Sequence, residues 1–556
     1  MKKNKSIIPI LLVVAIVLFA GIFGVLKLTE NTDGVGKAEK KLQKMISRIK
    51  PEETELIKGT VELTTTDLAE ELPDIDKNPI VLHGNGEVDI EIMSSPEKAG
   101  EDYDGWLLEV AERFNADGVT IDGKRVSVSV RSISSGTAAD YILSGKHVPA
   151  AYTPSNELWG EMLLSQGVEL EMVEEKLVGN VAGILLSDKT KKKIEEKYGK
   201  VSLQTVVQGT VDNEIAMGYT NPFSSSTGLN FLLETLYTYD KDDLLSTTAV
   251  EGFASFQKNV PFVAYTTMQM REAAASGSLD GMVMEYQTYI NSSDLRDYVF
   301  IPFGVRHDSP MYALSGLSGT EKKVLEAFTE YCMDMDSQKK AKEYGFNENE
   351  DYNSSLELDG KTILEAQKLW KDNKDSGNSI TAVFVADVSG SMSGAPINEL
   401  KESLINAGQY INEDNRIGLV SFSDRVSINL PIAAFDLNQR AYFNGAVNNL
   451  VALGGTATYD GITVAVDMLV KAKADDPNTK LVLFLLSDGK MNTGYDLNSI
   501  KSILEAYEIP VYSIAYGDEA DMEELKLVSS VNEATTISAD SDDVVYQLKN
   551  LFNAQM

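Results

Sequence analysis

The sequence predicts an α/β chain in which two globular parts follow a single N-terminal hydrophobic helix. A run of 20 uncharged residues, Ile7–Leu26, lies near the start of the chain. From Val88 onward, strand and helix patterns alternate, which is typical of a largely parallel sheet covered by helices. Near the end, four continuous apolar runs of strand length alternate with helical patterns, and such runs indicate strands buried on both faces.

The composition limits the classes of function. The chain has 556 residues, too many for one hydrophobic core, and 43 % are hydrophobic, so we expect two or three folded domains. A formal net charge of −34 disfavours binding to nucleic acid. One cysteine excludes an intrachain disulfide and a cysteine-based zinc site, and three scattered histidines do not predict a histidine-rich metal site. No nucleophile–base pair is evident, so we expect no enzymatic activity.

The N-terminal hydrophobic run is long enough to cross a bilayer as a helix. Lys2, Lys3 and Lys5 precede it, which favours an N-terminus on the inner side. A cleaved signal peptide is the alternative, but its apolar region is usually about 7–15 residues long and ends at a small-residue cleavage site. We therefore expect an uncleaved membrane anchor with the rest of the chain outside.

A short helix is predicted soon after this anchor. Leu42, Met45, Ile46 and Ile49 recur at helical spacing, and lysines occupy the other face. The segment is either an amphipathic helix that lies on the membrane surface or a stalk helix packed on the next domain. The sequence leaves both interpretations open.

The most specific motif follows the first apolar run of the last domain. Asp387, Ser389 and Ser391 place oxygen-bearing side chains at i, i+2 and i+4, on one side of an extended segment. Two further loops, at a helix start and at a strand end, add Thr456 and Asp488. Open α/β sheets bind ligands at the carboxyl ends of their strands, and such oxygens suit Mg²⁺ or Mn²⁺. The three loops together predict a divalent-metal site.

These motifs resemble the complete metal-ion-dependent adhesion site of a von Willebrand factor A domain, and the resemblance covers effectively the whole last domain. It implies a Rossmann-like, doubly wound sheet with helices on both faces. It also implies that Ser389, Ser391 and usually Thr456 ligate the ion, while Asp387 and Asp488 often act through water. An open position on the ion would then accept an acidic residue of a protein partner.

The middle part of the chain places hydroxyl groups just before three predicted helices. A helix N-terminus with free N–H groups and hydroxyls can bind an anion, although N-capping accounts for any single segment. The order of elements resembles bacterial extracellular solute-binding proteins of the type-2 periplasmic class, which have two α/β lobes joined by a hinge. That resemblance implies a solute cleft lined by Ser94, Ser95, Ser135, Thr137, Ser226 and Thr227.

Two features depart from the solute-binding resemblance. The stretch Glu97–Asp102 lengthens the first loop. No arginine is obviously placed to hold a charged ligand in the cleft, although Arg131 is a candidate. The resemblance therefore leaves the ligand of this domain open.

The predicted domains are an anchor over 1–28, a juxtamembrane linker and helix over 29–87, a solute-binding-like domain over 88–350, a linker over 351–378 and a von Willebrand factor A domain over 379–556. We expect a single-pass protein of a bacterial cell membrane, mostly extracytoplasmic. Its expected function is to bind a protein partner that offers an acidic residue to Mg²⁺ or Mn²⁺. The alternative is a transport or sensing accessory whose middle domain binds a small solute or oxyanion.

Overall fold

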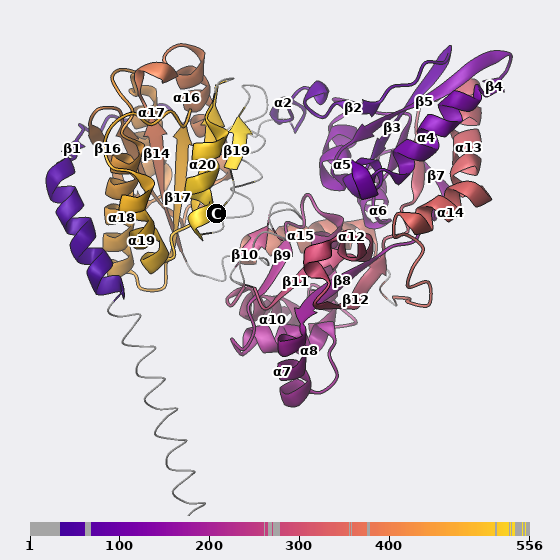
Figure 1. The fold of residues 1–556 in the computed structure, drawn as a ribbon, viewed down its shortest axis with the longest axis horizontal. Coiled ribbons are helices and arrows are strands. Elements are labelled where there is room, and N and C mark those ends of the chain that lie inside the picture. Colours follow the sequence, from indigo (N-terminus) through magenta and orange to yellow (C-terminus); the bar gives the residue numbers. More distant parts are fainter. Residues whose placement is uncertain are drawn as a thin grey trace, which may run out of the picture. The chain divides into compact units, whose positions relative to one another are not determined.

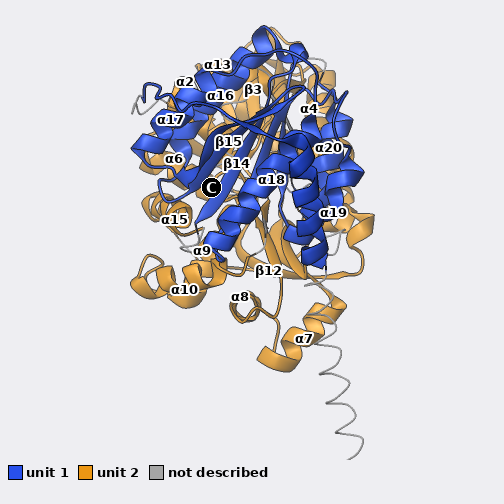
Figure 2. Cartoon of the chain, turned by 90° about the vertical axis from the view of Figure 1, so that its left-hand side faces the viewer, with its two compact units in different colours: residues 1–62, 379–541 blue, residues 63–378, 542–556 orange. Residues whose placement is uncertain are grey.

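Two compact units make up the computed structural model of the chain. Unit 1 joins residues 1–62 to 379–541, and unit 2 joins residues 63–378 to 542–556 (Figure 2). Unit 1 is therefore discontinuous in sequence, with most of unit 2 inserted within it. The structure describes residues 34–61, 68–260, 262–264, 270, 279–354, 356, 358–374, 379–517, 520–532, 534, 536–539, 548 and 551.

Unit 1 contains one mostly parallel sheet (Figure 1). Its strands are β1 (Glu52–Glu53), β14 (Ile380–Asp387), β15 (Arg416–Phe422), β16 (Val426–Ala434), β17 (Lys480–Ser487), β18 (Val511–Tyr516) and β19 (Thr536–Ala539). They lie in the order β1-β16-β15-β14-β17-β18-β19. The chain passes from β14 to β15 on one side and later to β17 on the other, so the strand order reverses at β14. Open α/β sheets bind their ligands at such a switch point.

Helices cover both faces of this sheet. They are α16 (Ala395–Ala407), α17 (Leu437–Asn448), α18 (Thr458–Asp475), α19 (Leu497–Tyr507) and α20 (Met522–Ser529). On one face, Val383 and Val385 of β14 share a core with residues of α18 and α19. On the other face, the ring centroid of Phe384 lies 5.6 Å from that of Phe443 in α17. Successive side chains of β14 point to opposite faces of the sheet, and helices cover both faces, so every residue of the strand is buried. The α/β sheet predicted for the last domain is confirmed.

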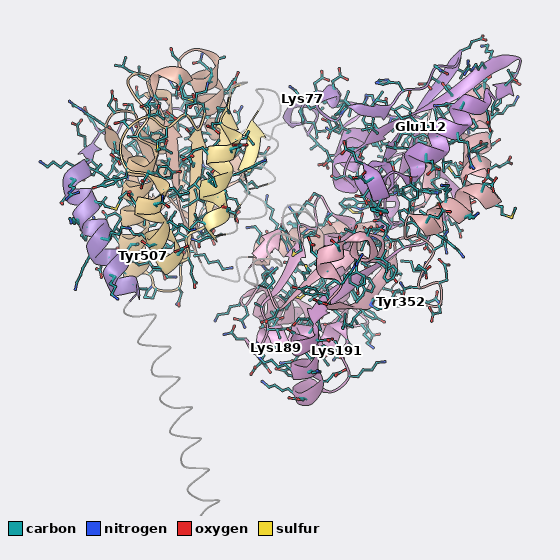
Figure 3. All side chains as sticks on the ribbon, viewed as in Figure 1. Lys77, Glu112, Lys189, Lys191, Tyr352 and Tyr507 are labelled. Atoms are coloured by element: carbon teal, nitrogen blue, oxygen red, sulfur yellow. The ribbon has the colours of Figure 1, made fainter. Side chains whose placement is uncertain are left out.

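The N-terminal segment belongs to the core of unit 1. Residues 34–49 form a helix, and Leu42 and Met45 on it are 0 % and 4 % exposed in the core shared with α18 and α19. Tyr507, labelled at the end of α19 in Figure 3, lies close to this helix, and burial together with the charge of Glu39 raises its pKa. The apolar face predicted by the helical spacing is therefore packed on the last domain of the chain.

The chain then runs along the edge of the same sheet. Strand β1 pairs in parallel with β16, and the N–H of Gly59 donates to the carbonyl oxygen of Ala441 in α17 at 2.8 Å. A Cβ atom on Gly445 would lie 1.8 Å from the carbonyl oxygen of Ile57. Only glycine at position 445 permits so close an approach of the two backbones.

The predicted transmembrane helix is not supported. Among the described residues, no helix is both long enough and apolar enough to cross a bilayer. Helix α18, for example, has 18 residues but carries Asp467 and Lys471 within it. The run Ile7–Leu26, on which the prediction rested, lies outside the described residues. We therefore do not retain the prediction of a single N-terminal transmembrane helix. The predicted single-pass location in a bacterial cell membrane depended on that helix and is not retained either.

Unit 2 contains two sheets. The first consists of β2 (Ile80–Leu82), β3 (Val88–Ser94), β4 (Thr120–Ile121), β5 (Lys124–Ser132), β6 (Ala151–Thr153), β7 (Leu170–Glu174) and β13 (Met311–Leu314). The second consists of β8 (Val181–Ser187), β9 (Met217–Thr220), β10 (Phe262–Ala264), β11 (Gly281–Glu285) and β12 (Tyr298–Arg306). The chain leaves the first sheet after β7 and returns to it after β12. Two crossing segments thus join two α/β lobes, as predicted for the middle of the chain.

Helices pack on both lobes of unit 2. Those of the first lobe are α2 (Leu68–Glu71), α3 (Pro96–Ala99), α4 (Trp106–Asp117), α5 (Ser135–Ser144), α6 (Leu158–Ser165), α13 (Gly319–Met333) and α14 (Met335–Glu343). Those of the second are α7 (Asp188–Tyr198), α8 (Leu203–Val211), α9 (Ser226–Tyr239), α10 (Thr247–Gln257) and α12 (Tyr286–Asn291). Helix α15 (Gly360–Asn373) also belongs to unit 2, because Trp370 on it is fully buried and donates its Nε1–H to the hydroxyl of Tyr219 at 2.7 Å.

Candidate functional site

The candidate metal centre begins where β14 ends. Asp387 is the last residue of this strand and is fully buried. Its Oδ1 accepts the backbone N–H of Ser389 at 2.8 Å, and its Oδ2 accepts the hydroxyl of Ser487 at 2.5 Å. Ser487 ends the neighbouring strand β17, in which Leu486 is the register partner of Ala386. Two adjacent parallel strands therefore hold the carboxylate in place.

Ser389 and Ser391 lie in the turn that follows the carboxylate. Their hydroxyl oxygens are 3.0 Å apart. Ser389 is fully buried, whereas Ser391 is exposed. The pair thus leads from the buried carboxylate to the surface, and each hydroxyl has lone pairs that can face a cation.

The second loop is hydrogen-bonded to the first. The N–H of Gly390 donates to the carbonyl oxygen of Gly454 at 2.9 Å. Thr456 follows in the same loop and is 2 % exposed. Asn492 positions it, because the N–H of Thr456 donates to Asn492 Oδ1 at 2.9 Å and Asn492 Nδ2 donates to Thr456 Oγ1 at 3.4 Å.

The third loop starts directly after β17. Asp488 is 5 % exposed, and its Oδ1 accepts the backbone N–H of Lys490 at 3.1 Å. Its carbonyl oxygen accepts the N–H of Asp521 at 2.8 Å. The hydroxyl of Ser487, which donates to Asp387, also accepts the N–H of Gly489 at 3.0 Å. This serine therefore couples the third loop to the first.

The electrostatics of this edge favour a cation. Burial raises the pKa of Asp387 to about 6, the charge of Asp488 acts in the same direction, and hydrogen bonds from Ser389 and Ser487 oppose the rise. A buried carboxylate is costly to ionise unless an opposite charge compensates it.

The donor set also fits a hard cation. Its two carboxylates and three hydroxyls are all oxygen ligands, which suit Mg²⁺ or Mn²⁺. Among the described residues, no group of three or more His, Cys, Asp or Glu side chains is placed to hold a metal. The hydroxyls are therefore an essential part of this candidate centre.

Two supporting residues were not assigned to the site from the sequence. Ser487 could have been recognised, because it ends a buried strand next to Asp488, at the edge where the other oxygen ligands were expected. Asn492 has no local signal, since its role arises only when its loop folds back onto Thr456.

In unit 2, the hydroxyls of the first lobe lie in a buried polar cluster. Ser94 ends β3 and Ser95 follows it, and they are 0 % and 1 % exposed. Ser95 Oγ donates to Glu97 Oε1 at 2.5 Å and accepts a hydrogen bond from Lys98 Nζ. Ser95 is the residue before α3, but its side chain makes no capping hydrogen bond. The capping interpretation therefore does not apply to this serine.

The second predicted hydroxyl segment joins the same cluster in part. Ser135 Oγ lies 3.5 Å from Ser155 Oγ and accepts the N–H of Ser155 at 3.2 Å. Thr137 has a local role, because Ser134 caps helix α5 by accepting the N–H of Thr137 at 3.4 Å.

The third predicted segment contacts different partners in unit 2. The indole N–H of Trp159 in α6 donates to Ser226 Oγ at 2.9 Å. Thr227 Oγ1 donates to Glu285 Oε1 at 3.3 Å, and the same oxygen lies 2.8 Å from His307 Nδ1. His307 follows β12 in the segment that returns to the first lobe, and it is fully buried. The six predicted cleft residues thus fall into separate hydrogen-bonded groups.

Arg131, the candidate cleft arginine, is used elsewhere. Its Nε donates to Glu91 Oε1 at 2.8 Å, and its Nη1 donates to the carbonyl oxygen of Ile75 at 3.0 Å. The cation that does lie among the serine hydroxyls is Lys98, which is fully buried. Lys98 lies in the stretch that lengthens the first loop, and nothing in the sequence predicts its burial.

Comparison with known proteins supports the assignment of the last domain. The von Willebrand factor type A domain family matches residues 382–554. The uncharacterized protein sll0103 of Synechocystis sp. is 24 % identical over 184 residues, which cover 33 % of this chain and 43 % of that protein. Inter-alpha-trypsin inhibitor heavy chain H3 of Mus musculus is 27 % identical over 174 residues, which cover 29 % of this chain and 19 % of that protein. The chain spans less than half the length of these curated relatives.

Solved structures of solute-binding proteins are also similar to this chain. A periplasmic thiamin binding protein aligns with 53 % of this chain and 99 % of its own, at 10 % identity and a TM-score of 0.39. The candidate metal centre lies within residues 382–554, the part of the chain that matches the von Willebrand factor type A domain.

Proposed function

We propose that the chain binds a protein partner through a divalent metal ion at the carboxyl end of β14. The observation that carries this proposal is the joining of three oxygen-bearing loops around the buried carboxylate of Asp387. Von Willebrand factor type A domains commonly bind a divalent metal ion and commonly mediate protein interactions.

The residues of the three loops would hold the ion in two ways, directly and through water. Ser389, Ser391 and Thr456 would contact it directly, and Asp387 and Asp488 would hold its water ligands, as the family resemblance implies. When bound, Mg²⁺ or Mn²⁺ supplies an electrophilic position for an acidic side chain of the partner. The exposure of Ser391 keeps this end of the site open to solvent.

The surface of the second loop suits a protein partner. Val451 and Leu453 in this loop are 72 % and 75 % exposed. The loop is the one whose Gly454 accepts the N–H of Gly390. A partner that brings a carboxylate to the ion would bury these apolar side chains, and burial of apolar surface adds to affinity.

We propose no catalytic role for this centre. The three loops offer serine, threonine and aspartate, and no histidine lies in them to act as a base. The Asp387 carboxylate already accepts two hydrogen bonds, which hold it in a fixed position.

Affinity capture with the full chain as bait tests the metal-dependent function. In Mg²⁺ buffer, the wild type should retain a specific protein, and EDTA or Asp387→Ala should release it. Asp414→Ala is a matched control, because Asp414 is exposed and precedes β15 at the opposite edge of the sheet. Partner binding that survives both EDTA and Asp387→Ala would contradict the proposal.

A second proposed function is the binding of a small solute or oxyanion by unit 2. It is favoured by Asn156, which is fully buried and whose Oδ1 has no hydrogen-bond partner. Its Nδ2 lies 3.1 Å from Nε2 of His307. Buried polar atoms are normally paired, so an unpaired acceptor marks a place for a hydrogen-bond donor of a small solute.

Thermal-shift screening of the full chain against metabolites and oxyanions tests this second function. A specific ligand at 100 times its Kd stabilises by about 2.7 kcal/mol. No shift of the unit 2 transition with any ligand would count against it.

A further inference from the structure

A fully buried lysine lies in α3, the short helix that follows β3 in unit 2. Lys98 is 0 % exposed, and its ammonium donates to Ser95 Oγ, to Glu97 Oε1 at 3.2 Å and to the carbonyl oxygen of Pro154 at 3.4 Å. A buried ammonium group requires a compensating negative charge. The Glu97 carboxylate supplies that charge.

This carboxylate is held as a bound anion would be held. It accepts the hydroxyl of Ser95 at 2.5 Å and pairs with the ammonium of Lys98. Burial opposes its ionisation, but the charge of Lys98 and hydrogen bonds from Ser95, Ser155 and the N–H of Glu97 itself lower its pKa. An ammonium and a hydroxyl therefore contact this carboxylate directly, and the Ser155 hydroxyl and a backbone N–H also favour its charged form. Such donors are those expected of an oxyanion site.

Two observations separate this cluster from an ordinary buried ion pair. The Glu97 side chain is 15 % exposed, whereas no side chain that holds it is more than 3 % exposed, so the carboxylate covers its donors from the solvent side. Thr153, whose backbone carbonyl accepts the N–H of Ser95 at 3.4 Å, is fully buried, and its Oγ1 has no hydrogen-bond partner. An unused polar group thus lies at the same strand ends.

We propose that Ser95, Ser155 and Lys98 form an oxyanion site that Glu97 fills with its own carboxylate. A free carboxylate, sulfate or phosphate binds there only when Glu97 moves out. Because Glu97 is tethered beside the site, it competes at a high effective concentration. This inference deepens the second proposed function, on which it rests, and does not depend on the metal centre.

Chemical rescue with acetate tests this site. Glu97→Ala removes the heavy atoms of one acetate ion and leaves the donors in place. In the full chain, acetate should raise the melting temperature of Glu97→Ala by several degrees relative to chloride at equal ionic strength. The apparent acetate affinity should exceed that of the wild type at least about tenfold, because the internal competitor is gone. Glu101→Ala, in which an exposed glutamate of the same loop is removed, should behave as the wild type.

Glu97→Gln is a second variant for the case in which Glu97→Ala, with Lys98 unpaired, does not fold. It removes the charge of Glu97 but keeps the side-chain volume. It should bind sulfate more tightly than the wild type, and adding Lys98→Ala should abolish the gain. Equal responses of wild type, Glu97→Ala and Glu97→Gln to acetate and sulfate would overturn the inference. If the wild type nevertheless binds another solute in unit 2, the inference fails while the second proposed function stands.

Discussion

Truncation of Leu42 should destabilise unit 1 and leave unit 2 unchanged. Leu42 lies in helix 34–49 and is 0 % exposed in the core that it shares with α18 and α19. Replacing a core leucine by alanine costs about 3 kcal/mol, because lost contacts and the remaining cavity add. In a unit of this size, that loss lowers the melting temperature by about 6–12 °C.

The tryptophans of the chain allow the two units to be followed separately. All three, Trp106, Trp159 and Trp370, are buried in unit 2. Tryptophan fluorescence therefore reports the unfolding of unit 2, whereas calorimetry reports both units. Leu42→Ala should lower the melting temperature of only one calorimetric transition, that of unit 1, which tryptophan fluorescence does not report. Lys44→Ala, at an exposed position of the same helix, should change the free energy of unfolding by less than about 0.5 kcal/mol.

An unshifted unit 1 transition in Leu42→Ala would refute the assignment of helix 34–49 to this core. Gly445→Ala provides an independent check on the segment that follows the helix. Its new Cβ would lie 1.8 Å from the carbonyl oxygen of Ile57 and would force the segment away from α17. The melting temperature of the unit 1 transition should therefore fall by several degrees, and the unfolding of unit 2 followed by tryptophan fluorescence should not change.

Two further predictions concern one residue of each unit. Asn492→Ala should weaken Mg²⁺ binding by about 10- to 100-fold without unfolding unit 1, because it removes the partner of Thr456; isothermal titration would measure the loss. Burial opposes ionisation of Glu91, but His147 and Arg131 outweigh it and lower its pKa to about 2. The ionised Glu91 carboxylate stabilises unit 2 fully above pH 4.5, and this stabilisation is lost as the pH falls towards 2. The free energy of unfolding of unit 2 should therefore be lower by about 2 kcal/mol at pH 3. Fluorescence-monitored unfolding of Glu91→Gln should lack this pH dependence, and an identical dependence would show that another group titrates.

Local patterns predicted where the residues of the candidate metal centre lie in the fold. Asp387 and Asp488 each follow a continuous apolar run, and such runs fix both the strand and the place where it ends. Helix α19 begins where Asp496 caps it by accepting the N–H of Ser499, and apolar residues recur along it at helical spacing. Where local pattern and tertiary position agree, the sequence alone is sufficient.

Long-range pairing accounts for much of what the sequence did not reveal. Strand β1 has two residues, and it pairs with β16, which follows the 63–378 segment of unit 2 in sequence. Strand β16 itself escaped prediction because Pro431 interrupts it and its residues are unevenly buried. No local signal could show that unit 1 is assembled from two distant segments.

Buried charge was the other feature that sequence reasoning could not supply. Glu97 and Lys98 lie in a charged stretch, and such stretches normally form solvated loops. Their burial depends on the hydroxyls of Ser95 and Ser155, which come from different segments of unit 2. The departure of this loop from the solute-binding resemblance was visible in the sequence, but its chemistry required the packed structure.

Titration of the full chain with Mn²⁺, followed by electron paramagnetic resonance, tests the central claim most directly. The wild type should bind one ion per chain, and Mg²⁺ should displace it. Ser389→Ala should lose this binding, because it removes the buried hydroxyl beside Asp387. A wild type that binds no Mn²⁺, or a Ser389→Ala variant that binds it with unchanged affinity, would contradict the metal-dependent function proposed for the edge of β14.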